Sequence, residues 1–150
     1  MEQLLEFALV VKATHREIQR RLNELLRPLG VTAAQAEAIL VIGDAGPLSL
    51  KELGELVIAE TGHPSRLVDR LVEAGLVVRR EVEEDRRRIE LTLSPRGRRL
   101  QTHIAQAHGT LLSWGRQATD GHDIGVAIEA MRALLEEGPL AATVRRRTKG

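Results

Sequence analysis

Apolar residues recur at helical intervals in the first part of the chain. From Glu2 to Arg27 they follow a helical period with no glycine or proline between them, and the segment 28–30 ends the pattern. This predicts one long helix. Residues 7–11 are apolar on more than one helical face, which exceeds what the surface helix of a monomer needs. We therefore expect a partner chain to cover the first half of this helix.

Two short helices are predicted next, each preceded by a capping residue. Thr32 offers an N-cap to residues 33–42, which end in a glycine-rich turn. Ser49 offers an N-cap to residues 50–57. Three helices therefore precede residue 58, where the pattern breaks.

A fourth helix and a hairpin follow. Residues 65–74 have an inward apolar stripe and a polar opposite face, and Gly75 stands where a helix commonly stops. The period then changes from helical to two over 76–82 and again over 89–93, which predicts two strands. The highly charged stretch 83–87 between them is expected to connect the strands and project into solvent.

Two more helices complete the pattern. Ser94 and Pro95 supply a cap and a first-turn proline to a helix that runs toward residue 115, and residues 124–135 predict a last helix. Leu and Ala together supply 40 residues, so aliphatic helix formers dominate the core. The predicted fold class is mostly α with a small β-hairpin (α+β).

Composition narrows the class of protein. The 150 residues include 22 Lys or Arg, 21 Asp or Glu and no cysteine, and 43% are hydrophobic. This length suits one domain with one core. The lack of cysteine excludes disulfides, thiolate metal sites and cysteine nucleophiles. An acidic start and the lack of an apolar run of about 18 residues lead us to expect a cytoplasmic protein without a membrane span.

The charge is distributed unevenly. The formal net charge is +1, but residues 1–60 carry −3, residues 61–100 carry +3, residues 101–144 carry −3 and the last six carry +4. The small total does not imply a polyanionic partner, yet the average hides a basic middle. The basic end is expected to be a solvated chain terminus.

The order of elements is that of a winged helix-turn-helix, in which a hairpin directly follows the second helix of the motif. Specific segments then resemble the MarR family of bacterial winged-helix regulators. These segments are Leu53-Gly54-Glu55-Leu56, the run 66–77, Asp85-Arg86-Arg87-Arg88, and Leu93-Ser94-Pro95-Arg96-Gly97. The Asp-x-Arg of the hairpin and the Leu-Ser-x-x-Gly that opens the next helix are the most recognisable pieces of that family.

The resemblance implies an obligate homodimer with one winged helix per subunit on a pseudo-palindromic operator in double-stranded DNA. It divides a single domain, 1–150, into a helical dimerisation region (1–30 and 95–137), a winged helix-turn-helix (31–94) and a basic tail (138–150). Two modules that read successive major grooves, about 34–36 Å apart, fit such a dimer.

Eight residues are candidates for DNA contacts. They are His63, Ser65, Arg66 and Arg70 in the second helix of the motif, Arg86 and Arg87 in the wing, and Ser49 and Lys51 at a helix N-terminus. The first four are expected to enter the major groove, where arginine forks onto a guanine edge. Arg86 is expected to reach the minor groove, and Arg87 matches the Arg of Asp-x-Arg, with Asp85 fixing its geometry and the turn. Ser49 and Lys51 are expected to contact phosphates.

The start of the recognition helix departs from the family's pattern. Relatives often begin it with a Ser-x-Ser-Thr-like sequence, whereas this chain has Glu60-Thr61-Gly62-His63-Pro64-Ser65. Proline is tolerated only in the first turn, so we expect the helix to begin near 61–63. Glu60 would repel phosphate if it faced DNA. The departure leaves an alternative open, a winged-helix protein-interaction module that has lost sequence-specific DNA binding.

The remaining polar residues have simpler explanations. Four histidines form no HxxxH pair and have few carboxylates near them, so we expect no metal site: His15, His103, His108 and His122. Trp114 is expected to pack between helices. Asp69 and Glu73 are expected to pair with Arg66 and Arg70 along one helix. With no catalytic triad or phosphate-binding glycine loop, we expect no enzyme and no cofactor.

The expected function is that of a sequence-specific transcriptional regulator, and more specifically of a repressor. The resemblance implies release from DNA by a small phenolic or anionic effector. Arg16, Arg20 and His15 on the first helix are open candidates for binding an anion. Cysteine-based peroxide sensing, which some relatives use, is excluded by composition.

Overall fold

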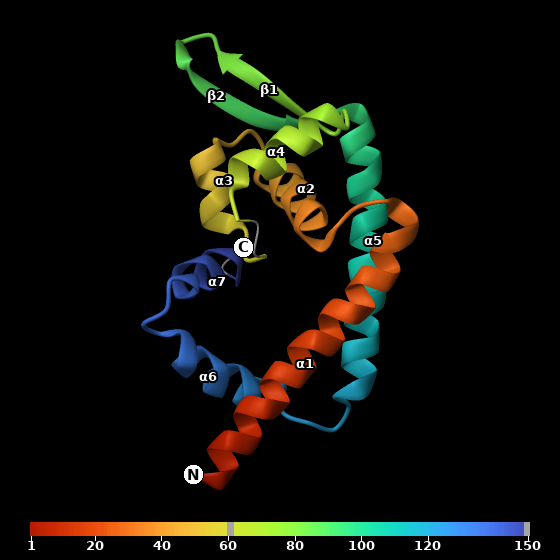
Figure 1. Cartoon of the computed structure of the whole chain (residues 1–150), viewed down its shortest axis with the longest axis vertical. Coiled ribbons are helices and arrows are strands. Elements are labelled where there is room, and N and C mark those ends of the chain that lie inside the picture. The colour runs from red at the N-terminus through yellow and green to blue at the C-terminus, as the bar shows by residue number, and fades with distance from the viewer. Residues whose placement is uncertain (60–61, 149–150) are drawn as a thin grey trace.

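The computed structural model describes residues 1–59 and 62–148, apart from the side chain of Arg86. The elements are α1 (Glu2–Leu26), η1 (Arg27–Leu29), α2 (Ala33–Ala45), α3 (Leu50–Leu56), α4 (Pro64–Glu73), β1 (Val77–Val82), β2 (Asp85–Leu93), α5 (Pro95–Ala118), α6 (Ile124–Leu135) and α7 (Leu140–Thr148). Figure 1 shows the hairpin at one end of an elongated molecule and the start of α1 at the other. The predicted class, mostly helical with one hairpin, is confirmed.

The predicted helix starts agree with the structure because the capping chemistry is local. Thr32 Oγ1 accepts a hydrogen bond from the Gln35 N–H at 3.2 Å, and the Thr32 N–H donates one to Gln35 Oε1 at 3.0 Å. Ser49 and Glu52 form the same reciprocal box at the start of α3. Each pair satisfies N–H groups that a helix start otherwise leaves without partners.

The hydrophobic core is centred on α2. This helix contacts α1, α3, α4, α5 and β2. The largest fully buried side chains are Leu26, Ile39, Ile42, Leu53, Val68, Leu71, Leu91 and Ile104. All but Leu26 and Ile104 belong to the segment from α2 to β2, so the winged module carries most of the core and the long helices α1 and α5 each close one side of it.

The hairpin is longer at its tip than the sequence indicates. Only residues 83–84 form the turn, and residues 85–87, expected in the connection, belong to β2. The ladder pairs Glu81 with Ile89 and then Val82 with Asp85, so residues 86–88 form a bulge. A bulge lengthens one strand without ending the pairing, which is why charged residues suited to a loop lie in a strand.

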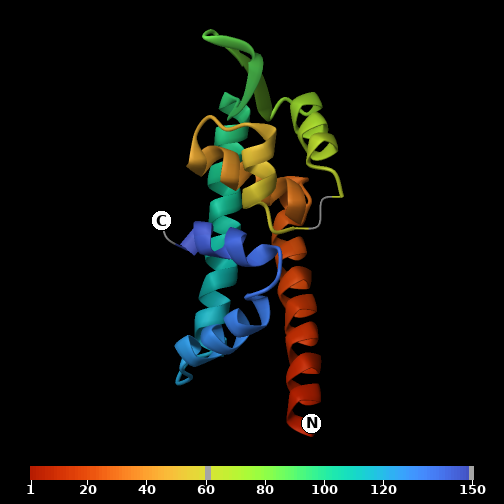
Figure 2. The same ribbon diagram turned by 90° about the vertical axis from the view of Figure 1, so that its left-hand side faces the viewer.

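The C-terminal segment is not the solvated tail expected from its charge. Residues 140–148 form α7, which packs against α3 (Figure 2). Ala141 and Thr143 are buried. The apolar and small residues on one face of α7 supply the contact, while its arginines point outward or pair with acidic groups. By contrast, α6 has no buried residue.

Within the described ranges, no single helix is long and apolar enough to cross a membrane. One pair, the α1–η1 segment together with α2, passes that test only jointly and is bent by 76°.

Candidate nucleic-acid interface

The recognition helix α4 begins at Pro64, just after the predicted range 61–63. His63 is its N-cap residue, with an extended backbone and no side-chain capping bond. Pro64 occupies the first helical position, where its missing N–H costs nothing. Glu60 and Thr61 lie outside the described residues, so the expectation that Glu60 repels phosphate is not tested.

One face of α4 is buried and the other is exposed. Leu67, Val68 and Leu71 pack into the core, whereas Ser65, Arg66 and Arg70 are exposed. The three candidate residues on α4 therefore lie on its accessible face. They do so because the polar positions are out of phase with the buried ones along the helical period.

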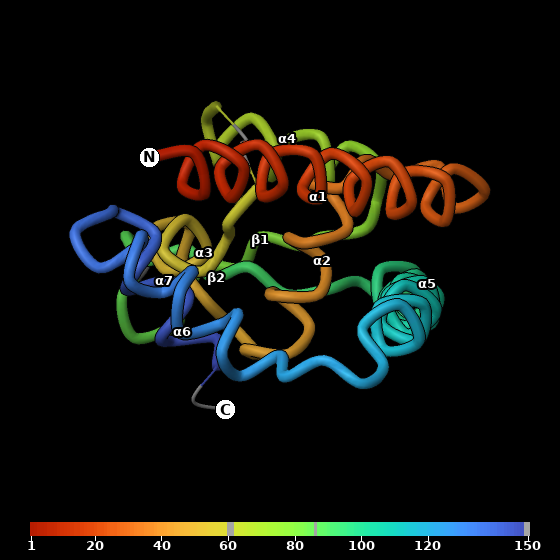
Figure 3. The backbone as a smooth tube through the Cα atoms, turned by 90° about the horizontal axis from the view of Figure 1, so that it is seen from below, coloured from red at the N-terminus to blue at the C-terminus, as the bar shows by residue number. Residues whose placement is uncertain are grey.

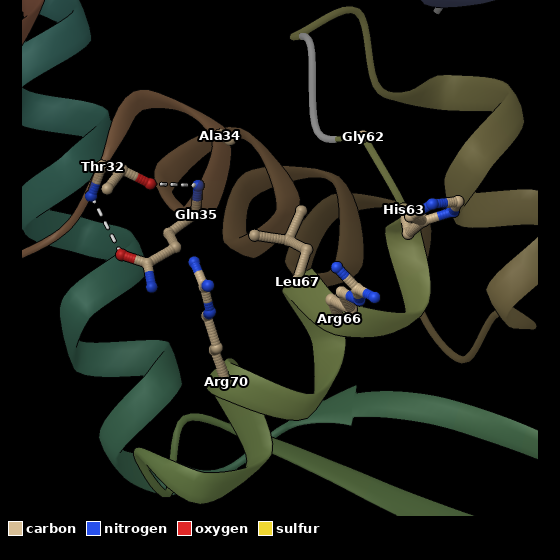
Figure 4. Close-up of a pocket in the computed structure, with 8 residues that line it drawn as sticks. All are labelled: Thr32, Ala34, Gln35, Gly62, His63, Arg66, Leu67 and Arg70. Carbon is tan, nitrogen blue, oxygen red and sulfur yellow. Dashed lines mark hydrogen bonds between the residues drawn. The ribbon is translucent and has the colours of Figure 1, made fainter.

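Three of those candidates line a shallow hollow between α4 and α2. Its volume is about 280 Å³, and its lining residues are Thr32, Ala34, Gln35, Gly62, His63, Arg66, Leu67 and Arg70. Figure 4 shows Arg70 extending toward Gln35 of α2, with Arg66 and His63 nearer the start of α4. Among the described residues, Arg66 and Arg70 form no ion pair or hydrogen bond with an acidic side chain. Their guanidinium donors are therefore available to an anion or a base edge.

Asp69 does not pair with Arg66 or Arg70, contrary to expectation. Its carboxylate pairs with Arg79 of β1. Arg66 and Arg70 are three and one residues away from Asp69 along α4, but β1 offers a third guanidinium, that of Arg79, and the carboxylate pairs with it. The expected pairing of Glu73 is likewise absent from the described ion pairs. The Asp69–Arg79 pair ties the recognition helix to the wing.

A network of backbone bonds fixes the end of α4. The N–H of Leu76 donates to Leu71 O at 2.9 Å, and the N–H of Gly75 donates to Val72 O at 2.9 Å. Gly75 has a φ of +71°, which a residue with a Cβ rarely adopts. These bonds make a Schellman motif, so the predicted stop at Gly75 is confirmed.

The Leu-Ser-x-x-Gly segment joins the recognition helix to α5. Ser94 Oγ donates to Gly75 O at 2.6 Å and accepts from the Gly97 N–H at 3.0 Å. A Cβ on Gly97 would lie 2.1 Å from Leu76 O, so only glycine lets α5 approach the backbone just before β1. The motif that suggested the family from sequence therefore has a structural reason, since it sets where α4 and the wing sit on α5.

The wing places its arginines at the bulge. Asp85 Oδ1 accepts a hydrogen bond from the Arg87 backbone N–H at 3.1 Å, so Asp85 fixes the turn, as expected, through the backbone of Arg87. The Arg87 side chain is exposed, and Arg88 lies 3.7 Å from a Glu90 carboxylate oxygen. The side chain of Arg86 lies outside the described residues, so its predicted reach into the minor groove is not tested.

The start of α3 is already satisfied internally. The Ser49 N–H donates to Glu52 Oε2 at 2.7 Å, and Ser49 Oγ accepts from the Glu52 N–H at 3.2 Å. These bonds with Ser49 lower the pKa of Glu52, and the nearby Arg88 adds to the effect. Ser49 therefore has only its hydroxyl hydrogen left to donate to a phosphate. The Lys51 side chain is exposed, so its ammonium is accessible to one.

Sequence reasoning missed Glu37 of α2. Its carboxylate accepts from the Ile58 N–H at 3.0 Å and the Ala59 N–H at 2.7 Å, in the turn that joins α3 to α4. It also pairs with Arg147 of α7. The Glu37 side chain is only 13% exposed. Its partners are 21, 22 and 110 residues away in sequence, so no local pattern identifies them.

The remaining polar candidates are Trp114 and the histidines. The Arg21 guanidinium carbon lies 4.1 Å from the centre of the Trp114 ring, so Trp114 packs between α5 and α1 as expected. Among the described residues no group of three or more His, Cys, Asp or Glu side chains is arranged to hold a metal ion. His108 is half-buried, and desolvation lowers its pKa, to which the charge of Arg147 contributes.

Comparison with known proteins agrees with this geometry. Residues 29–88 match the model of a family described as the MarR family. The chain is 28% identical over 131 residues to the organic hydroperoxide resistance transcriptional regulator of Bacillus subtilis (strain 168), covering 87% of this chain and 88% of that protein.

Two further similarities involve one relative from Escherichia coli. The chain is 30% identical over 95 residues to the multiple antibiotic resistance protein MarR of strain K12, covering 63% of this chain and 66% of that protein. A crystal structure of a mutant of that protein complexed with operator DNA has a TM-score of 0.69 and 24% identity, covering 90% of this chain and 94% of the other.

Proposed function

Because the chain belongs to the MarR family of transcriptional regulators, we propose that it is a homodimeric repressor that binds a pseudo-palindromic operator in double-stranded DNA. As a member of this family it is a regulator and not an enzyme. The E. coli relative of the same fold is complexed with operator DNA. In the proposal, the winged module (31–94) reads DNA in the cytoplasm, and the long helices join the subunits.

The observation that carries the proposal is the exposed face of α4. It presents Arg66 and Arg70, with His63 and Ser65 beside them, next to a wing whose bulge holds further arginines. Arginine forks onto the O6 and N7 of guanine in the major groove and pairs with phosphate. The exposed Arg87 and Lys51 extend the same cationic surface to the wing and to the start of α3.

The homodimer is supported by apolar side chains that the single chain leaves uncovered. They are Leu4 at 65% exposure, Leu5 at 63%, Leu9 at 59%, Val10 at 56%, Leu112 at 69%, Val126 at 64% and Leu134 at 64%. All lie on α1, α5 and α6, away from the recognition helix. Figure 3, the view from below, shows α1 crossing one side of the molecule and α6 on the other. An uncovered apolar area of this extent marks an interface.

A cavity beside the recognition helix supports the proposal that a small anionic effector binds this protein. It has a volume of about 300 Å³ and is lined by Leu29, Gly30, Val31, Ala74, Leu76, Arg96, Arg99, Leu100 and His103. No acidic side chain is among these residues, and the apolar ones fit the body of a small organic acid or phenolate. Arg96 Nη1 donates to Ala74 O, the cap of α4, at 3.1 Å. An anion that captures Arg96 would break this bond and loosen the recognition helix.

Of the first-helix candidates for that effector, Arg20 is the one already engaged by acidic side chains. Arg20 already bonds to Glu17 and Glu24 at 2.7–2.8 Å. The arginine partners lower the pKa of Glu17 to about 2, so this acidic neighbour stays ionised and holds Arg20. Since the chain has no cysteine, a thiol does not carry any response here.

Selection of random duplexes by the purified protein tests the proposal. We expect enrichment of an inverted repeat with half-sites about one helical turn apart. If the dimer neutralises about 8 phosphates, the logarithm of the binding constant should fall with the logarithm of the salt concentration at a slope of about −7. Arg66→Ala should relax base preference, whereas Arg27→Ala, at an exposed arginine outside the motif, should not. A folded dimer that enriches no sequence would instead favour the protein-interaction module.

A further inference from the structure

The C-terminal helix α7 is attached to the helix-turn-helix at two separate points. The first is the end of α3. Thr143 Oγ1 donates to Glu55 O at 2.9 Å, and Arg146 pairs with the Glu55 carboxylate. Thr143 is only 7% exposed. This bond satisfies a carbonyl in the last turn of α3, where backbone acceptors lack helical partners.

The second attachment reaches the turn between the two helices of the motif. Arg147 pairs with Glu37, and the Glu37 carboxylate accepts from the N–H groups of Ile58 and Ala59. One carboxylate thus joins α2, α7 and the turn. Since Glu37 is 13% exposed, its bonds lie in a medium less polarisable than water and are stronger for it.

The turn that Glu37 holds leads directly into the recognition helix. Ala59 is four residues before His63, the N-cap of α4. His63 itself has no side-chain capping bond. Among the described residues before α4, the nearest ones held by a side chain are therefore Ile58 and Ala59, which bond to Glu37. Arg147 pairs with the same carboxylate and orients it.

We propose that α7 is a clamp on the helix-turn-helix, in which Arg147 and Glu37 are positioning residues that set the start of the recognition helix. The inference rests on the proposed function, because its consequence is operator affinity. A charge-assisted hydrogen bond holds each of the two turn amides. Without Arg147 the Glu37 carboxylate loses its cationic partner and samples more rotamers. Its hydrogen bonds to the turn then break more often, so the start of α4 is less ordered when it binds the operator.

The test compares Arg147→Ala with Arg146→Ala in the full chain. Both substitutions remove one arginine and one ion pair of α7, but only Arg147 contacts the carboxylate that holds the turn. Amide hydrogen exchange of Ile58 and Ala59 is measured by NMR without DNA, and operator affinity is measured separately. Arg147→Lys serves as the rescue variant, since it keeps a cation near Glu37.

In Arg147→Ala we expect the exchange of both amides to rise about tenfold and operator affinity to fall about tenfold, since bonds to charged groups are the strong ones. Arg146→Ala should change either quantity less than about twofold, and Arg147→Lys should recover most of the loss. Unchanged exchange in Arg147→Ala, in a folded protein, overturns the clamp. Faster exchange with unchanged affinity overturns the positioning role.

The exchange measurement does not depend on DNA. If the wild type enriches no operator, the proposed function fails while the exchange of Ile58 and Ala59 still decides whether α7 holds the turn. If Arg147→Ala unfolds, Arg147→Gln replaces it: an uncharged side chain cannot supply the charge of the guanidinium, so smaller changes in the same direction support the clamp and unchanged exchange overturns it.

Discussion

Replacing Gly97 by alanine should destabilise the protein, although alanine is the better helix former. The new Cβ would lie 2.1 Å from Leu76 O and 3.1 Å from Leu76 C. Real Cβ contacts essentially never fall below 3.0 Å, so the backbone must separate by at least about 0.9 Å. Leu76 O also accepts from the Ser94 N–H at 3.0 Å, so the shift stretches that bond too.

The magnitude follows from opposing contributions. Overpacking of this kind costs about 1–3 kcal/mol, and a weakened hydrogen bond adds about 1 kcal/mol. Gly→Ala in a helix returns at most about 1 kcal/mol, and less in the first turn. We expect a net loss of about 2 kcal/mol, which corresponds to a Tm lower by about 4–8 °C for a chain of this size.

Gly54→Ala is the matched control, because Gly54 is also helical but its Cβ would meet only Pro64 Cγ, at an ordinary 3.6 Å. Both variants are unfolded thermally under circular dichroism at one protein concentration. Gly54→Ala should be neutral or slightly stabilising. If Gly97→Ala melts at or above the wild-type temperature, the close approach of α5 to Leu76 is not a constraint and the structural reason given for the Leu-Ser-x-x-Gly motif is wrong.

Three further predictions follow. Burial lowers the pKa of His108, so the fold prefers neutral imidazole; its contribution to the free energy of unfolding is complete above pH 6.5 and is lost as the pH falls from 6.5 toward the lower folded pKa. Denaturant titrations from pH 7.5 to 5 should show this loss in the wild type and a flatter profile in His108→Asn; equal slopes contradict it. Ser94→Ala removes a cap and a donor to Gly75 O and should cost about 2 kcal/mol in the same denaturant assay, with Ser94→Thr close to wild type. Val126→Asp on the uncovered face of α6 should shift the protein from dimer to monomer in light scattering, whereas Glu129→Gln should not; a Val126→Asp dimer would place the interface elsewhere.

Local chemistry explains why so much of the fold was predictable. Capping at Thr32, Ser49 and Ser94 depends on residues three positions apart, and the positive φ at Gly75 depends on one residue. The helical period predicted which positions of α4 are buried. The same locality explains the error at the hairpin, because whether charged residues 85–87 form a loop or a bulged strand depends on the partner strand.

The candidate DNA-binding residues were partly predictable for the same reason. Exposure of Arg66, Arg70 and Arg87 follows from period and from the motif. Which acidic groups neutralise which arginines does not follow, as the pairing of Asp69 with Arg79 shows. Ion pairs are chosen by whichever element packs closest, and sequence spacing ranks only partners on the same helix.

Local patterns in the sequence were enough to predict the order of elements from α1 to α6, apart from η1, together with several helix caps and the winged helix-turn-helix. Two features emerge only in the folded chain: the basic C-terminal segment forms a helix that packs on α3, and Glu37 joins α2, α7 and the turn before the recognition helix. The physical reason is distance along the chain: a hydrogen bond between residues three apart is encoded where it forms, whereas one between residues 110 apart exists only after packing has brought the two helices together.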